Sequence, residues 1–347
     1  MLSASQELGM VYRDQNGIDI QHDKKNETSY KRVLPGQFVI HLRSFQGGFA
    51  YSEIEGITSP AYTVMSFKNS SEQYGLFWKH VFKSEIFIKR LETITYGIRD
   101  GRSISFSDFN SLLLQYPSFS EQKLIGDSIA VIERGITLHQ RKLDNLKLKK
   151  KALLQKLFPK NGERYPELRF PGFTDAWEQC KLSEVTTCFD NLRVPVTASD
   201  RIPGKIPYYG ANGIQDYVSG YTHSGEFVLI AEDGANDLND YPIQYVNGAI
   251  WVNNHAHVIA GYKGKLENKF LSYSLKTVKM STFIVGGGRS KLNLKALLEI
   301  PISMPNHDEQ CCIGKFIETI DKTITLHQRK LDHLQLQKKA LLQQMFV

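Results

Sequence analysis

The chain has 347 residues, of which 41% are hydrophobic, enough for two domains with separate cores. No apolar run approaches the roughly 18–20 residues of a membrane-spanning helix, and the first ten residues lack the basic and apolar segments of a signal peptide. The four cysteines form no C-x-x-C pair, which indicates free thiols in a reducing compartment. We therefore expect a cytoplasmic protein.

The net charge of +7 and the isoelectric point near 9.0 suit a polyanionic partner. Two segments hold this charge. Residues 136–159 carry seven Lys or Arg against one Asp, and residues 324–347 carry four against one. The rest of the chain is close to neutral, which argues against a broad basic face that coats nucleic acid without specificity.

Residues 1–117 predict a first α+β domain. Strands are expected over residues 36–43 and near residues 62–67, followed by a helix over about residues 73–91. A long helix should then occupy about residues 121–158, within a spacer segment at residues 118–160. At 1.5 Å per residue this helix would be roughly 57 Å long.

The helical segment from Ile136 to Pro159 recurs from Ile324 to Val347, with 18 of 24 residues identical. The offset of 188 residues also relates Glu121-Gln122 to Glu309-Gln310. Apolar residues recur in both copies at a spacing of 4 and 3, typical of a coiled-coil seam. The predicted seam comprises Ile125, Ile129, Ile132, Ile136, Leu143, Leu146, Leu153 and Leu157, and Ile313, Ile317, Ile320, Ile324, Leu331, Leu334, Leu341 and Met345.

Two further seam positions are polar in both copies, His139/His327 and Lys150/Lys338, and polar seam residues fix register and orientation. The repeat predicts internal pseudo-twofold symmetry and two helices that pack antiparallel on each other. The alternative is that each helix packs only on its own domain.

Residues 161–305 predict a linker and a second α+β domain, and residues 306–347 a distal spacer helix. The linker is rich in Pro, Gly and charge and enters the domain near Trp177. Short strands then alternate with Gly, Asn and Asp turns, and a helix is expected over residues 268–278.

Several segments together resemble the DNA-specificity subunits of type I restriction-modification systems. They are residues 34–39 (LPGQFV), 56–62 (GITSPAY), 177–182 (WEQCKL) and 206–213 (IPYYGANG), with Glu-Gln in each of residues 117–132 and 305–320. The resemblance covers nearly the whole chain. It implies a non-catalytic bacterial or archaeal subunit whose two recognition domains each read one half of a bipartite double-stranded DNA site.

The same resemblance implies that the helices dock two methyltransferase subunits, which nuclease-translocase subunits then join. S-adenosylmethionine, ATP and Mg would be bound by those partners, and this chain would hold no cofactor or metal. Aligning Gly225 with Gly36 places Met1 opposite about Asp190, so the first recognition domain lacks the counterpart of residues 177–182. We expect either a shortened domain or a true start upstream.

The sequence carries no Asn/Asp-Pro-Pro-Tyr/Phe methyltransferase motif and no GxxxxGK[ST] phosphate loop. The alternative, a stand-alone DNA methyltransferase or nuclease with divergent motifs, is therefore disfavoured.

Features that differ between the two domains can read different bases, whereas shared features can only position DNA. Arg102 and Arg289 recur in Gly-Arg-Ser before a short helix and suit phosphate anchors. Arg, Lys, Asn, Gln and Tyr side chains are the candidate readers of bases. In the first domain these are Arg13, Gln15, Asn16, Gln21, Lys24 and Lys25, and in the second Arg193, Arg201, Lys205, Tyr208, Tyr209, Asn212 and Gln215. Tyr208 and Tyr209 equally suit a strand core.

Overall fold

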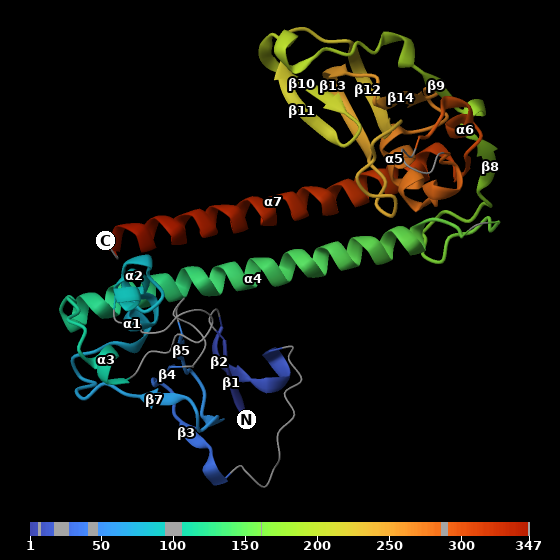
Figure 1. The fold of residues 1–347 in the computed structure, drawn as a ribbon. Coiled ribbons are helices and arrows are strands. Elements are labelled where there is room, and N and C mark those ends of the chain that lie inside the picture. Colours follow the sequence, from blue (N-terminus) through green and yellow to red (C-terminus); the bar gives the residue numbers. More distant parts are fainter. Residues whose placement is uncertain are drawn as a thin grey trace. The chain divides into compact units, whose positions relative to one another are not determined.

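The computed structural model describes residues 1–5, 8–16, 28–40, 48–93, 106–160, 162–285 and 291–345. The chain divides into two compact units. Unit 1 comprises Met1–Arg141 and Gln328–Val347, and unit 2 comprises Lys142–His327. Each of the two long helices, α4 (Phe119–Leu157) and α7 (His307–Met345), therefore contributes one half to each unit (Figure 1).

Unit 2 is built around a six-stranded sheet with the strand order β11-β10-β13-β12-β14-β9. Neighbouring strands are antiparallel except β10 and β13, which run parallel. A separate antiparallel pair joins β15 to β8. The strands are β8 (Glu178–Lys181), β9 (Thr186–Cys188), β10 (Pro203–Gly210), β11 (Gly213–Val218), β12 (His223–Ala231), β13 (Ile243–Val252), β14 (Ala256–Gly261) and β15 (Pro301–Met304).

The core of unit 2 lies between this sheet and its helices. Helix α5 (Asn268–Thr277) packs on β12 and β13 (Figure 1), and α6 (Leu294–Leu298) follows it. The side chain of Glu267 caps α5 by accepting a hydrogen bond from the Phe270 amide. Because β12 is covered on both faces, its last five residues are all buried, as in a strand with two apolar faces.

Unit 1 holds smaller sheets, β1-β2, β3-β6 and β5-β4-β7, all antiparallel among the described residues. An aromatic cluster that includes Phe38, Phe49 and Trp78 forms its core. The strands are β1 (Leu2–Ser5), β2 (Gly9–Tyr12), β3 (Lys31–Val33), β4 (Phe38–Ile40), β5 (Phe49–Tyr51), β6 (Gly56–Thr58) and β7 (Thr63–Met65), and the short helices are α1 (Gly75–Val81), α2 (Glu85–Thr93) and α3 (Phe106–Asn110). The predicted α+β class is confirmed.

The single helix predicted over about residues 73–91 is wrong, because the structure has α1 and α2 with a break at residues 82–84. Ser84 explains the break. Its hydroxyl donates to the Val81 carbonyl, 2.8 Å away, and accepts from the Phe87 amide, 3.2 Å away. Serine thereby ends one helix and caps the next, a signal that hydrophobic periodicity does not carry.

Along α4 and α7 the predicted seam residues are buried or half-buried, except one. Ile129, Ile317 and Leu143 are at most 1% exposed. Met345 is 37% exposed because α7 ends at this residue.

Within each unit the two helix halves run antiparallel. In unit 1, Glu133 pairs with Lys338 at 2.7 Å, and Leu342, further along α7, packs against the cluster of Ile125 and Ile129, which lie earlier in α4. In unit 2, Lys150 pairs with Asp321 at 2.5 Å. The two ion pairs are equivalent in the internal repeat, because at the offset of 188 residues Lys150 corresponds to Lys338 and Glu133 corresponds to Asp321.

A buried glutamine anchors the start of each long helix to its globular part. Gln122 accepts a hydrogen bond from the Tyr74 amide and donates to the carbonyls of Glu72 and Pro117. Gln310 repeats this pattern with the Glu267 amide and the carbonyls of Lys265 and Pro305. The internal duplication thus extends from sequence to hydrogen bonds.

Candidate nucleic-acid interface

Four segments of unit 2 meet at one edge of its sheet and form what we call the loop rim. They are the turn at residues 211–212, the loop at residues 232–242, the turn at residues 253–255, and the positions Val285 and Lys291. Asn212 joins the first two, because its side-chain NH₂ donates to the Gly234 carbonyl (2.8 Å) and its side-chain oxygen accepts from the Asn236 amide (3.0 Å).

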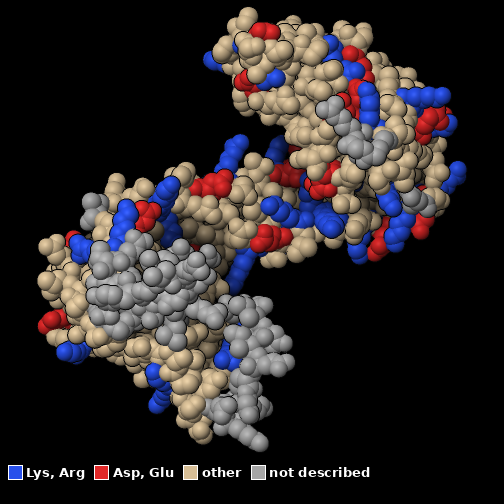
Figure 2. All heavy atoms as spheres, viewed as in Figure 1, with Lys and Arg blue, Asp and Glu red and all other residues tan. Residues whose placement is uncertain are grey.

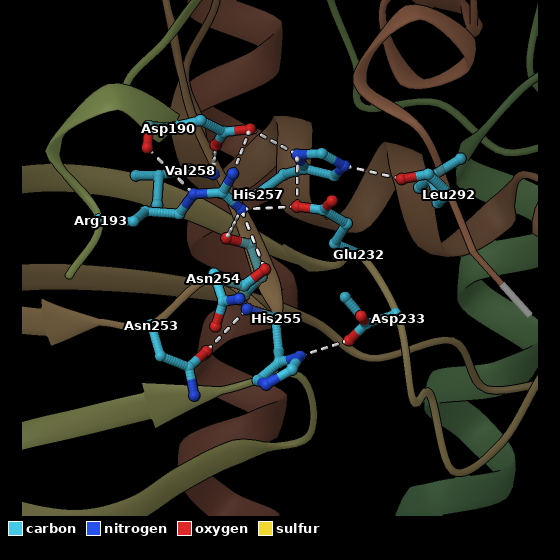
Figure 3. Close-up of polar contacts among 12 residues, drawn as sticks. Asp190, Arg193, Glu232, Asp233, Asn253, Asn254, His255, His257, Val258 and Leu292 are labelled. Atoms are coloured by element: carbon cyan, nitrogen blue, oxygen red, sulfur yellow. Dashed lines mark hydrogen bonds and ion pairs between the residues drawn. The ribbon is translucent and has the colours of Figure 1, made fainter. Parts of the chain in front are cut away.

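Backbone hydrogen bonds fix the remaining parts of the rim. The Glu232 amide donates to the His255 carbonyl at 2.9 Å, and the Leu292 amide donates to the Glu232 carbonyl at 2.7 Å. Lys291 forms isolated β-bridges to Asp233 and Val285. The His255 ring lies 2.6 Å from Asp233 (Figure 3). The rim is therefore a rigid platform rather than a set of independent loops.

A buried ion network centred on Arg193 supports the rim (Figure 3). Its guanidinium lies 2.7 Å from Glu232 and 3.3 Å from Asp190, and it donates to the Ala256 carbonyl at 2.9 Å. The side chains of Arg193, Glu232 and Asp190 are only 15%, 14% and 12% exposed. Lys291 adds a second cation, 3.0 Å from Glu232.

Both carboxyls of the network stay ionised. Burial alone would raise the pKa of Asp190, but hydrogen bonds from His257 and the Val258 amide, with the charge of Arg193, hold it below its usual range. Burial opposes ionisation of Glu232 as well, yet hydrogen bonds from Arg193 and Lys291 lower the pKa of that carboxyl. His257 is 1% exposed. Its two ring nitrogens face Asp190 (2.6 Å) and the Leu292 carbonyl (2.8 Å).

Among the described residues, Asp190, Glu232 and His257 are the one cluster whose ligand atoms lie close enough to hold a metal ion. The guanidinium of Arg193 and the ammonium of Lys291 already neutralise these two carboxylates. A divalent cation would have to displace both, so the donor set does not fit a metal. The cluster supports the rim through its ion pairs and hydrogen bonds.

A basic groove of about 1400 Å³ in unit 2 borders the loop rim. Its walls come from the second half of α4, from α5 and the residues after it, and from Asp237, Asn239 and Asp240 of the rim loop. Seven lysines line it, against the four carboxylates of Glu167, Asp237, Asp240 and Asp321: Lys147, Lys150, Lys151, Lys156, Lys160, Lys276 and Lys279.

Two of the carboxylates are already paired, Asp321 with Lys150 and Glu167 with Lys156. The groove therefore keeps an excess of positive charge beside the polar rim. Figure 2 shows one face of the molecule, on which Lys and Arg are interspersed with Asp and Glu along the long helices rather than gathered in one broad basic face.

Comparison with known proteins gives a consistent result for this part of the chain. Residues 174–336 match the family described as "Type I restriction modification DNA specificity domain". Over 161 residues the chain is 45% identical to a Haemophilus influenzae protein named as a type I restriction enzyme specificity subunit, covering 46% of this chain and 41% of that relative. Residues 174–336 are thus similar to type I DNA specificity domains.

More distant relatives extend beyond the specificity domain. The type I restriction enzyme MjaVIII specificity subunit of Methanocaldococcus jannaschii is 21% identical over 268 residues, covering 67% of this chain and 61% of the relative. A crystal structure of a type I restriction-modification S subunit from M. genitalium aligns with 91% of this chain and 84% of its own, with a TM-score of 0.69 and 16% identity. The fold is therefore similar to that of an S subunit over 91% of the chain, and the resemblance read from the sequence is confirmed.

Three residues of the specificity domain that the sequence predicts as base readers form contacts with other residues of the protein. Arg193 is held in the ion network. Tyr208 is 1% exposed, and its hydroxyl accepts from the Val196 amide at 3.0 Å and donates to the Val196 carbonyl at 3.2 Å. The Arg201 guanidinium lies 4.1 Å from the centre of the Tyr208 ring and also contacts Asp216. These side chains form contacts within the domain. Of the two interpretations left open for Tyr208, base reader and strand-core residue, its burial supports the strand core.

The other candidates in the specificity domain are placed differently. Asn212 is exposed but joins the rim loops, Tyr209 is half-buried, and Gln215 and Lys205 are exposed on β11 and β10. In unit 1, Arg13 is half-buried in a 3₁₀ turn at residues 13–16 that also contains Gln15 and Asn16. Gln21, Lys24, Lys25, Arg102 and Arg289 lie outside the described residues.

Sequence reasoning missed Glu232, His257 and the groove. Asp190 and Arg193 stand three residues apart, a spacing that signals an ion pair, but nothing in the sequence brings Glu232 and His257 to it. The sequence shows the lysines of α4 as a run of charged residues. It does not predict that they lie beside the loop of residues 237–240, because only the fold brings the two segments together.

Proposed function

We propose that this chain is the non-catalytic DNA-reading subunit of a type I restriction-modification complex, in which each unit reads one half of a bipartite double-stranded target. The observation that carries the proposal is the loop shared by the rim and the basic groove. Lysines of the groove would hold the phosphate backbone while the rim faces the base edges, the division of labour of sequence-specific proteins.

The rim offers suitable chemistry for reading bases. Asn239 and Asn254 are exposed in the rim, and Gln215 of β11 is exposed next to it, with its side-chain oxygen 3.5 Å from the Asn253 side-chain nitrogen. Amide side chains can bond adenine edges at two points. Asp237 is exposed beside them and can accept from the amino group of cytosine. Because the Arg193 network holds the loops rigid, these groups would need little ordering on binding.

We further propose that the helices dock two methyltransferase subunits, which carry S-adenosylmethionine, and that nuclease-translocase subunits with ATP and Mg join this core. Exposed leucines that recur at equivalent positions of the two helices support the proposal of two equivalent docking surfaces. Leu138 and Leu148 of α4 are 65% and 66% exposed, and their repeats Leu326 and Leu336 are 67% and 66% exposed. Each unit thus presents one leucine from each helix, as two identical partners would need.

Binding and methylation measurements with the reconstituted complex would test the DNA proposal. Lys151→Gln should weaken binding about equally on all sequences and lower the salt slope by roughly one unit, because it removes a phosphate contact. Gln215→Ala should instead relax specificity at one position of one half-site, at a cost of about 1–3 kcal/mol. If both variants change the same base preference, the assignment of the groove to phosphates is wrong.

The docking proposal makes a separate prediction. Native mass measurement of the complex should give two methyltransferase subunits per chain, and the double variant Leu138→Asp/Leu336→Asp should lower this to one, since it places charge in one of two equal apolar surfaces. Leu168→Asp, at a position 44% exposed outside the long helices, is the control. An unchanged ratio in the double variant would show that these leucines do not dock the partner.

A further inference from the structure

A histidine of the loop rim is held by a carboxylate through one ring nitrogen and leaves the other nitrogen open. The side chain of His255 is 48% exposed, and its Nδ1 atom lies 2.6 Å from the Asp233 carboxylate. Figure 3 shows the second ring nitrogen, Nε2, on the side of the ring away from Asp233. Within the described part of the chain, no group forms a hydrogen bond with Nε2. This nitrogen is therefore available to a ligand.

The backbone of His255 is fixed on both sides. Its amide donates to the side-chain oxygen of Asn253 at 2.8 Å, and Asn253 is itself only 4% exposed. Its carbonyl accepts from the Glu232 amide at 2.9 Å. Glu232 precedes Asp233 and belongs to the Arg193 network, so both partners of the histidine–carboxylate pair are connected to the rigid part of the rim. His255 thus presents Nε2 from a fixed position.

The contact with Asp233 decides which nitrogen of the neutral ring carries the proton. An ionised carboxylate can only accept hydrogen bonds, so Nδ1 must donate and must hold the proton. The neutral ring has a single N–H group, which leaves Nε2 as a hydrogen-bond acceptor. The exposed amide side chains of the rim, on Asn239 and Asn254, can both donate and accept. Nε2 of His255 is more selective, because it can only accept.

Two other roles for the pair have less support. A role in holding the turn is already filled by the hydrogen bonds of Asn253 and of the Glu232 amide, and an exposed ion pair adds little to stability. A metal site would need a third ligand, and the one candidate cluster among the described residues includes neither His255 nor Asp233. Recognition of a hydrogen-bond donor is the use that the geometry favours.

The major-groove edges of DNA bases differ in the donors that an acceptor can find. Adenine presents the N6 amino group and cytosine the N4 amino group, whereas guanine and thymine present only hydrogen-bond acceptors there. Each base pair contains one amino base. An acceptor at a fixed position therefore distinguishes the strand on which that base lies.

We propose that His255 determines specificity at one position of the half-site read by unit 2, where Nε2 accepts a hydrogen bond from the amino group of adenine or cytosine. Asp233 is then a positioning residue, which keeps Nε2 an acceptor. The inference rests on the proposed function, because it requires the rim to face base edges. It adds that one position of this half-site is A or C on one strand and excludes G and T.

Selection of binding sites from random duplexes by the reconstituted complex tests the assignment. The parent should prefer A or C over G or T about tenfold or more at one position. Asp233→Asn should reduce this preference to about twofold or less, because an amide can donate to Nδ1 as well as accept and no longer selects the tautomer. His255→Lys, whose side chain only donates, should prefer G or T at the same position. Glu299→Gln, which removes a carboxylate from an exposed ion pair outside the rim, should keep the parent's preference.

A purely structural pair would give a different result. Asp233→Asn would then weaken binding to all sequences and leave the preferred bases unchanged, which would overturn the inference. A His255→Lys complex with the parent's preference would overturn it too. So would a parent that selects a bipartite site in which no position depends on residues 233 and 255, with the proposed function left standing. A parent complex that selects no sequence at all would overturn the proposed function as well.

Discussion

Arg193 shows how one side chain can set the geometry of a surface it does not reach. It lies below the rim, and the two carboxylates beside it belong to Asp190, ahead of β10, and Glu232, after β12. Removing the arginine would leave two buried charges with one cation fewer, a larger effect than losing a surface pair.

Arg193→Met should lower the free energy of unfolding of unit 2 by about 3 kcal/mol, the usual cost of breaking a buried ion pair. Lys156→Gln, which removes one partner of a pair that is 51% and 52% exposed, should change it by less than about 0.5 kcal/mol. Urea unfolding followed by tryptophan fluorescence compares the two. Similar losses in both variants would contradict a special role for Arg193.

The effect of Arg193→Met on the free energy of unfolding should also depend on pH. The pKa values of Asp190 and Glu232 are depressed in the folded protein, so their stabilising contribution is present above about pH 4 and is lost as the pH falls through the folded values. The difference in stability between the parent and Arg193→Met should therefore be largest near pH 7 and shrink below about pH 4. A constant difference from pH 7 to pH 3 would show that the network does not titrate as a unit.

At the scale of elements, a repeated ion pair fixes the register of the helices. Lys150 and Asp321 are 20% and 33% exposed, and their repeats Lys338 and Glu133 are 32% and 27% exposed. Each pair places a charge of α4 against an opposite charge of α7. A shift by one helical turn would break both pairs at once.

A double-mutant cycle on Lys150→Met and Asp321→Asn should give a coupling of about 1 kcal/mol, because the pair is half-buried and well aligned. The same cycle on Lys151 and Asp321 should give none, since Lys151 is exposed and forms no ion pair with Asp321. Equal couplings would mean that the charge of the helix matters and the specific pair does not.

The long helices could be predicted because a 3.5-residue period sustained over nearly forty residues has few structural interpretations. Lys150 and Lys338 could be identified as polar seam positions, but their partners could not, because the antiparallel register depends on contacts between residues about 170 and 205 positions apart. The contacts that Arg193 and Tyr208 make within the protein could not be predicted for the same reason. Burial of a polar side chain is decided by partners that lie far away in sequence.

For the whole molecule, the helices are expected to set the gap between two DNA half-sites. Inserting four residues after Arg141 and four after Arg329, equivalent positions 188 residues apart, would lengthen each helix by about 6 Å. At 3.4 Å per base pair this is nearly two base pairs. Methylome sequencing should show a longer gap with unchanged half-site sequences.

A single insertion is the control for this experiment. Four residues added to α4 alone would keep one repeated ion pair only by breaking the other, so we expect loss of stability rather than a new gap. If the paired insertion leaves the gap between the half-sites unchanged, the length of the helices does not set that gap.

The division into units also determines the order in which the two units can complete their folding during synthesis. Unit 2 is one continuous stretch of chain, whereas unit 1 needs the last turns of α7, where Leu342 packs against the aromatic cluster that includes Phe82. Because domains fold as they leave the ribosome, the domain that is made first must wait for the residues that are made last. Until then α4 presents part of its apolar seam unpaired, so a released chain that ends at His327 should bind chaperones through unit 1 while unit 2 is already folded.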